Sequence, residues 1–316
     1  MVPLHVFRRC ASIVLTCALT QQGAHAVAGV EPSSWSPRAS TATATLHPGS
    51  LFMFEDPTPL RPAFKGYCTL NFLFSGSDGS MYMGTAGHCQ PEAHTNPEDA
   101  YSPTNSDRSW PAGQGPVAMD THGNRIGEFA YYIQNAPETA FSAINGPGNR
   151  RLPVGDFALI RLDANVGASP SVCHFGGPWG VFTDTPSRPL EMRMYGNGYG
   201  LGYNHTTESP LPAAARPLVA TTGAPNKEYI FADTAFSVSD SGSPVLTVDG
   251  KAIGVFSGVW EGYRVQGGIE AGSVIIARIQ PLRRAAEKKL GISLDLERAK
   301  ATADVSAVPN GASKCG

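Results

Sequence analysis

The stretch Phe236-Ser-Val-Ser-Asp-Ser-Gly-Ser-Pro-Val245 (FSVSDSGSPV) joins two apolar ends through small polar residues, an aspartate and a glycine. On its own, the triplet Asp240-Ser241-Gly242 indicates only a turn. A serine hydroxyl is a poor nucleophile at neutral pH. It becomes reactive only when a base takes its proton, a carboxylate holds that base in the right tautomer, and donors stabilise the oxyanion. The rest of the chain has to supply these groups.

Two further motifs supply candidates for the base and the carboxylate. Thr85-Ala-Gly-His-Cys89 presents His88 beside a cysteine, and Gly155-Asp-Phe-Ala-Leu-Ile-Arg-Leu162 places Asp156 at the head of a buried strand. Taken singly, His88 would be a structural histidine and Asp156 an ordinary turn acid. Their order along the chain, together with the serine loop, favours a shared site.

In this order the three motifs resemble those of secreted chymotrypsin-like serine proteases of the bacterial, trypsin-like type. His, Asp, Ser is the chain order of that family, whereas α/β-hydrolases have Ser, Asp, His. The resemblance covers about residues 46–290. It implies that His88 is the general base, Asp156 its orienting carboxylate and Ser241 the nucleophile, with roles taken from the chymotrypsin triad.

The resemblance also implies an oxyanion hole formed by the backbone N–H groups of Ser239 and Ser241. The family usually has glycine where this chain has Ser239. Serine adopts glycine-like dihedrals only with about 1–3 kcal/mol of local strain. Loss of one such donor typically lowers turnover by ~10²–10³-fold. The alternatives are an active endopeptidase, a weak or inactive homologue that binds peptides or proteins, and an esterase with the same triad.

A substrate pocket follows from the same resemblance. Its wall is Ser257-Gly258-Val259, with Gly272 opposite, and Val259 should narrow its mouth. In trypsin-like members, an aspartate six residues before the nucleophile binds Lys or Arg. Here that position is Ala235, and Asp233 is out of register. We expect a neutral side chain of small to medium size before the cleaved bond.

The first residues have the pattern of a secretory signal. Arg8 and Arg9 precede a short apolar run over residues 11–20, and Ala24-His25-Ala26 matches a cleavage site. The run is too short to span a bilayer, so residues 1–26 are expected to be removed from a secreted, extracellular protein. Removal changes the net charge from −2 to −4. A weakly acidic protein offers no electrostatic footprint for nucleic acid or anionic lipid.

Removal of this segment leaves four cysteines, and an even number in an exported chain suggests two disulfides. The resemblance implies that Cys68 and Cys89 form the bridge that pins the histidine loop. Cys173 and Cys315 are left over, and we predict that they pair. Bacterial members pair the aspartate before the nucleophile with an arginine. Here His174 stands at that place, either as the partner of Asp240 or as a surface histidine.

Composition and pattern predict an all-β fold. The 316 residues include 35 glycines and 26 prolines, and short β-rich runs alternate with turn clusters. Only Pro281–Leu290 has a helical pattern. We expect two packed antiparallel six-stranded β-barrels and a C-terminal helix. The expected parts are a flexible or pro-region (27–45), a first barrel with His88 and Asp156 (46–165), a second barrel with Ser241 and the helix (166–290), and a tail (291–316).

Other parts of the chain carry weaker predictions. Cys68–Phe74 is predicted as one strand, and residues 90–124, which are polar and rich in Pro, Asn and Asp, as a surface insertion. There is no H-E-x-x-H motif and no cysteine pair with zinc spacing, so no metal or organic cofactor is expected. We expect a monomer that acts on a peptide or protein substrate, with no nucleic-acid or membrane partner.

Overall fold

A computed structural model of the protein describes residues 45–55, 65–91, 106–134, 144–145, 151–152, 155–172, 175–185, 190–196, 216–220, 228–236, 239–264 and 270–300. Several predictions fall outside these residues, namely those on the signal segment, on residues 27–44, and on Cys173, His174 and Cys315. Among the described residues, no helix combines the length and the apolar character that crossing a bilayer requires.

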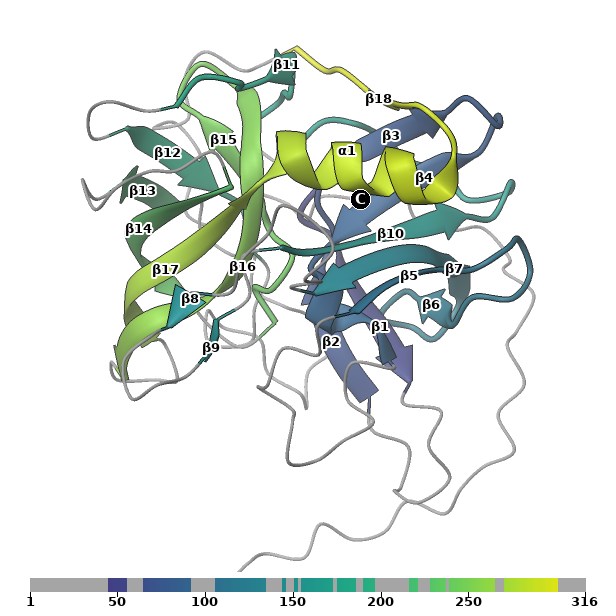
Figure 1. Cartoon of the computed structure of the whole chain (residues 1–316), viewed down its shortest axis with the longest axis horizontal. Coiled ribbons are helices and arrows are strands. Elements are labelled where there is room, and N and C mark those ends of the chain that lie inside the picture. The colour runs from purple at the N-terminus through teal and green to yellow at the C-terminus, as the bar shows by residue number, and fades with distance from the viewer. Residues whose placement is uncertain are drawn as a thin grey trace, which may run out of the picture. The chain divides into compact units, whose positions relative to one another are not determined.

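The first sheet has nine antiparallel strands in the described part of the chain (Figure 1). Its hydrogen-bonded order is β18-β3-β4-β10-β7-β6-β1-β2, and β5 pairs with β7 at the side. The strands are β1 (Leu51–Glu55), β2 (Lys65–Thr69), β3 (Leu73–Gly76), β4 (Met81–Thr85), β5 (Ser106–Ser109), β6 (Val117–Met119), β7 (Arg125–Gln134), β10 (Asp156–Leu162) and β18 (Leu294–Leu296).

The second sheet closes on itself. Its order is β11-β16-β15-β12-β13-β14-β17, and β17 pairs back with β16, so six of the described strands form a ring of pairings. The strands are β11 (Gly180–Val181), β12 (Glu191–Met194), β13 (Arg216–Ala220), β14 (Tyr229–Phe236), β15 (Pro244–Thr247), β16 (Lys251–Arg264) and β17 (Glu270–Arg278). β8 (Ile144–Asn145) and β9 (Arg151–Leu152) form a separate pair.

Strand β10 carries the core of the first sheet because it lies between β4 and β7 and is buried on both faces. Alternate residues of a strand point to opposite faces. Phe157 and Leu159 accordingly pack into one apolar cluster, and Ala158 and Ile160 pack into another. This two-sided burial fixes the strand, and Asp156 stands at its first position.

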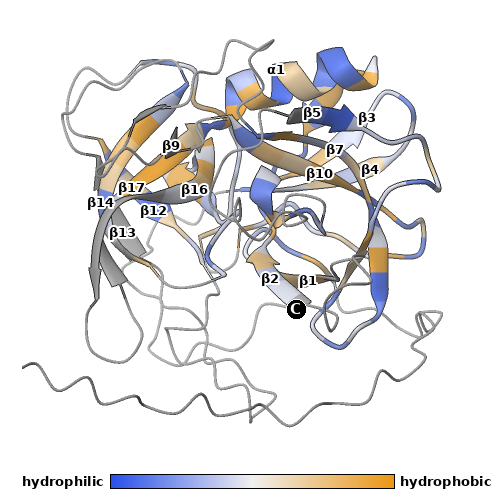
Figure 2. Ribbon diagram, turned by 60° about the horizontal axis from the view of Figure 1, so that its bottom comes forward, coloured by the Kyte–Doolittle hydropathy of each residue, from blue (hydrophilic) through white to orange (hydrophobic). Residues whose placement is uncertain are grey.

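The only helix among the described residues, α1 (Ile279–Leu290), directly follows β17 and ends at Gly291. Its buried residues Ile279, Leu282 and Ala286 recur at helical spacing, and its exposed residues Arg284, Lys288 and Lys289 are charged (Figure 2). The buried residues join an apolar cluster that also contains Phe74 of the first sheet and Val255 of the second. The helix therefore packs where the cores of the two sheets meet.

The all-β fold class with two curled antiparallel sheets and one late helix is confirmed. The prediction of one strand over Cys68–Phe74 is wrong. The chain leaves β2 after Thr69, and the side chain of Asn71 accepts a hydrogen bond from the backbone of Phe72, which interrupts the ladder before β3 begins.

The prediction of a surface insertion over residues 90–124 is wrong for its second half. There β5 pairs with β7, and β6 pairs with both β1 and β7. Trp110 is buried and stacks on Tyr132, with ring centroids 5.5 Å apart. These strands have only four and three residues, so their local pattern is too short to reveal them without their pairing partners.

Residues 291–300, expected to belong to a tail, instead return to the fold. Leu294, Asp295 and Leu296 pair with β3, and the backbone N–H of Ala299 donates to the carbonyl of Pro178. Leu294 and Leu296 are buried, whereas Asp295 between them is exposed. This alternation is that of an edge strand with one face against the core.

Replacing Leu294 by alanine should therefore lower the free energy of unfolding by about 2–5 kcal/mol, because a fully buried leucine is truncated. Asp295→Ala is the matched control on the same strand and should change it by no more than about 0.5 kcal/mol. Denaturant unfolding of the disulfide-bonded protein measures both. Equal, small effects would contradict a structural role for this segment.

Candidate active site

Asp156 stands at the head of β10 and is fully buried. One of its oxygens, Oδ1, accepts a hydrogen bond from the backbone N–H of His88 at 2.8 Å. The other, Oδ2, lies 2.8 Å from His88 Nδ1 and accepts the hydroxyl of Ser257 at 2.8 Å. A buried carboxylate is costly unless it is hydrogen-bonded, and these three contacts account for both oxygens.

His88 lies in a short 3-10 turn, Gly87–Cys89, that follows β4. The turn comes so close to β7 and β10 that a Cβ at Gly87 would lie 2.2 Å from the carbonyl oxygen of Ile133 and 3.0 Å from Asp156 Oδ1. Only glycine fits there. The contact with Asp156 puts the ring proton on Nδ1, so Nε2 can accept a proton.

Burial of the ring and the contacts with Asp156 act in opposite directions on the pKa of His88. Burial of the ring would by itself lower its pKa, but the nearby negative charge and the hydrogen bond outweigh burial, and the pKa lies above its ordinary value. The His88 side chain still has 26% of its surface exposed. The imidazole is therefore both held by a carboxylate and open on one side.

The serine loop packs against the histidine loop through Gly242. Its φ is +90°, and a Cβ there would lie 2.2 Å from the carbonyl oxygen of Thr69 and 3.0 Å from the backbone nitrogen of Ala86. Glycine is required on both counts. Ser243 closes the loop by donating its hydroxyl to the carbonyl of Asp240 at 2.6 Å. Asp240 itself is fully buried.

Strand β2 links the serine loop to the histidine loop. The backbone N–H of Thr69 donates to the carbonyl oxygen of Ser241 at 2.8 Å. Cys68, one residue earlier, forms the expected disulfide with Cys89, which follows His88. Cys89 Sγ lies 3.9 Å from the carbonyl oxygen of Ser241. The structure therefore brings His88, Asp156 and the backbone of Ser241 into one site.

Ser239 has a φ of +78°, and it is the only described residue other than glycine with a positive φ. Holding serine in this region costs about 1–3 kcal/mol. Its carbonyl accepts the hydroxyl of buried Thr69 at 2.8 Å, a bond that contributes about 0.5–1.5 kcal/mol. The hydroxyl of Ser239 is buried and has no hydrogen-bond partner among the described residues.

The predicted pocket residues lie on three strands of the second sheet. Ala235 pairs with Ala271, Val259 with Val274, and Gly272 with Thr234 and Gly262. The structure does not describe the side chains of Ala235 and Val259 or the surroundings of Gly272, so the role of these three residues in lining a pocket stays a prediction. Gly258 follows Ser257 and pairs with Ile275. Asp233 is exposed and accepts the hydroxyl of Ser273.

Two positioning contacts could not be found from the sequence. Ser257 was expected only to line the pocket, yet its hydroxyl binds Asp156, 101 positions away. Thr69 was not singled out at all. A serine inside a strand and a threonine beside a cysteine have no distinctive local pattern, because both contacts depend on the two sheets meeting.

Two other groupings do not add to this site. Cys68 Sγ, Cys89 Sγ and a ring nitrogen of His88 lie within 4.8 Å of one another, but both sulfurs are in the disulfide and cannot bind a metal as thiolates.

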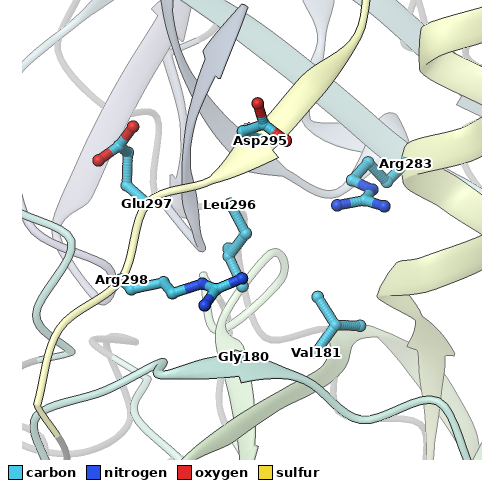
Figure 3. A pocket seen from close by; sticks show the side chains of 7 residues that line it. All are labelled: Gly180, Val181, Arg283, Asp295, Leu296, Glu297 and Arg298. Atoms are coloured by element: carbon cyan, nitrogen blue, oxygen red, sulfur yellow. The ribbon is translucent and has the colours of Figure 1, made fainter.

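A separate cavity of ≈ 460 Å³ lies between β11, α1 and β18 (Figure 3). It contains none of the residues above and is lined by Gly180, Val181, Arg283, Asp295, Leu296, Glu297 and Arg298.

The structure therefore combines two curled antiparallel sheets, one late helix and a histidine–aspartate pair beside a serine loop. The solved structures that resemble this chain include the crystal structure of Nocardiopsis protease (NAPase), at 16% sequence identity and a TM-score of 0.40. The alignment covers 80% of this chain and 100% of that one. No family model matches the sequence. No curated protein matches it either. A likeness of this size does not extend to activity, which has to be argued from the site itself.

Replacing Asp156 by asparagine should lower the pKa of His88, because burial then acts without the opposing charge. NMR titration of the ring protons measures this, with His88→Gln to assign the signal. Ser257→Ala is the control that keeps the charge, and there the pKa should stay raised. A pKa that does not fall in Asp156→Asn would contradict the assigned cause.

The same change has a consequence for stability. A histidine pKa that folding raises stabilises the protein below the unfolded pKa of about 6.5, and this contribution is lost as the pH rises through the folded pKa. The loss of unfolding free energy in Asp156→Asn should thus be larger at about pH 5.5 than at about pH 8.5. Denaturant unfolding at both pH values measures it.

Proposed function

We propose that this protein is a secreted serine endopeptidase that hydrolyses peptide bonds with Ser241 as nucleophile, His88 as general base and Asp156 as orienting carboxylate. The observation that carries the proposal is the pair of contacts from one buried carboxylate to both the backbone and the ring of His88, each 2.8 Å long. An ordinary structural histidine does not need its tautomer fixed this firmly.

The chemistry follows from these positions. Ser241 Oγ attacks the carbonyl carbon of a peptide bond while His88 Nε2 takes the hydroxyl proton. The backbone N–H groups of Ser239 and Ser241 stabilise the oxyanion. His88 then gives the proton to the leaving amine, an acyl-enzyme remains on Ser241, and water releases the acid by the same steps. Asp156 stays ionised throughout and steadies the imidazolium.

The substrate is a peptide or protein whose residue before the cleaved bond is neutral and small to medium in size. Ala235 offers no charge to a basic side chain, and the carboxylate of exposed Asp233 is engaged by Ser273. The disulfide between Cys68 and Cys89 supports an extracellular setting, because such bonds persist in oxidising compartments.

A second candidate function is that of a weak or inactive homologue that binds peptides without cleaving them. The observation that favours it is the left-handed conformation of Ser239, whose N–H is one of the two oxyanion donors. A serine held there with strain can let its peptide rotate away, which would leave the hole incomplete. Reactivity at Ser241 separates the two candidates.

The protein should react with a fluorophosphonate probe, because an activated serine attacks phosphorus as it attacks a carbonyl. Labelling should disappear in Ser241→Ala and fall by about 10³-fold or more in His88→Ala. Fluorescence after gel separation measures the rate. Absence of labelling in correctly folded, disulfide-bonded wild-type protein would reject the enzyme and leave the binding homologue.

Substrate class follows from a second comparison. Turnover of a peptide amide with a small neutral residue before the scissile bond should exceed turnover of the corresponding peptide with arginine there, and both activities should vanish in Ser241→Ala. Hydrolysis of small esters with no turnover of any peptide would instead identify an esterase that uses the same triad.

A further inference from the structure

Thr69 makes three hydrogen bonds at the end of β2, and it is completely buried. Its N–H donates to the carbonyl of Ser241, and its hydroxyl donates to the carbonyl of Ser239, both at 2.8 Å. Its own carbonyl accepts the hydroxyl of buried Thr85 at 2.9 Å. One residue of the first sheet thus holds both ends of the three-residue segment that contains the nucleophile.

We infer that Thr69 is a positioning residue whose hydroxyl keeps Ser239 in the left-handed conformation that directs its N–H to the oxyanion. This inference rests on the proposed function, since it names the device by which this chain tolerates a serine at the donor position. A backbone bond alone, such as that from Thr69 to Ser241, would not restrain Ser239. The hydroxyl adds that restraint.

The restraint follows from backbone geometry. Thr69 binds the carbonyls of both Ser239 and Ser241, so the chain is anchored on the C-terminal side of Ser239. Rotation of φ from +78° to the negative values that serine prefers changes the angle between the N–H and the carbonyl of Ser239. The two groups then cannot both keep their directions, and the relaxed conformer loses the contact with the Thr69 hydroxyl. A contact made in one conformer and lost in the other shifts the equilibrium toward the first.

Ser239 does not supply this restraint itself. Residues that tolerate positive φ often do so through a local hydrogen bond from their own side chain. The hydroxyl of Ser239 is buried and makes none among the described residues. The bond that opposes relaxation therefore comes from Thr69, and the carbonyl of Thr69 is in turn tied to Thr85.

The test is a set of coupled substitutions in the full chain. Thr69→Val removes the hydroxyl and keeps the shape, and it is made in the wild type, in Ser239→Gly and in Ser239→Ala. Glycine at position 239 relieves the backbone strain of the positive φ. Alanine removes the Ser239 hydroxyl, which has no hydrogen-bond partner among the described residues, and keeps the strain. In the wild type and in Ser239→Ala, the loss of the Thr69 hydroxyl should slow fluorophosphonate labelling by at least about 10-fold, up to the ~10³-fold cost of one lost donor.

In the Ser239→Gly background, Thr69→Val should change the labelling rate by no more than about 2-fold. Glycine adopts the left-handed conformation without strain, so loss of the Thr69 hydroxyl releases nothing there. Thr69→Ser retains the hydroxyl and should restore most of the rate. Thr85→Val is the matched control: it removes a buried threonine hydroxyl that does not contact Ser239, so its effect should be the same whichever residue stands at 239. With a peptide substrate, the loss in Thr69→Val should appear in kcat more than in KM.

Thermal unfolding of all variants tests the same coupling without activity. Thr69→Val should lower Tm more in the wild type and in Ser239→Ala than in Ser239→Gly. Equal effects in all three backgrounds, on both rate and Tm, would overturn the inference. If no variant is labelled but the Tm coupling is present, the proposed enzyme fails while the restraint on Ser239 stands. If labelling is normal and the coupling is absent, the enzyme stands and the restraint fails.

Discussion

The fully buried carboxylate of Asp156 forms hydrogen bonds with both sheets. Burying this charge is tolerable only because three donors surround it: the backbone and the ring of His88, which follows β4 in the first sheet, and the hydroxyl of Ser257 on β16 of the second. The same contacts that make the burial possible also fix the histidine and raise its pKa. Stability and the candidate chemistry therefore depend on one set of hydrogen bonds.

Strand β2 provides the second connection between the sheets. Thr69 holds the carbonyls of Ser239 and Ser241, while neighbouring Cys68 is bonded to Cys89 beside His88. The disulfide closes a loop of 21 positions, so it limits how far the histidine turn can move from the serine loop. His88 and Ser241 are thus placed by separate elements that share one strand. A site held on strands and by close glycine contacts keeps its geometry better than one carried by free loops.

Ser239 is the point at which this chain departs from the pattern it resembles. The strain of its positive φ, about 1–3 kcal/mol, is of the same size as the hydrogen bond from Thr69, about 0.5–1.5 kcal/mol, together with the packing of the buried loop. The two conformers are therefore close enough in free energy for substrate or a single hydroxyl to decide between them. In the proposed enzyme such a balance would make the oxyanion donor adjustable, whereas glycine would adopt the conformation at little cost.

Local sequence alone was sufficient for features that depend on short stretches. The helix before Gly291, the buried strand that begins at Asp156 and the turn at Asp240-Ser241-Gly242 all follow from periodicity and turn chemistry, and the motif resemblance pointed to the bridge between Cys68 and Cys89. Tertiary structure alone decided the rest. Strands β5, β6 and β18 have only three or four residues each, and they exist because β7, β1 and β3 offer hydrogen bonds. The contacts of Ser257 and Thr69 likewise arise only where the sheets meet, since a hydroxyl's partner is set by distance in space and leaves no periodic trace in the chain.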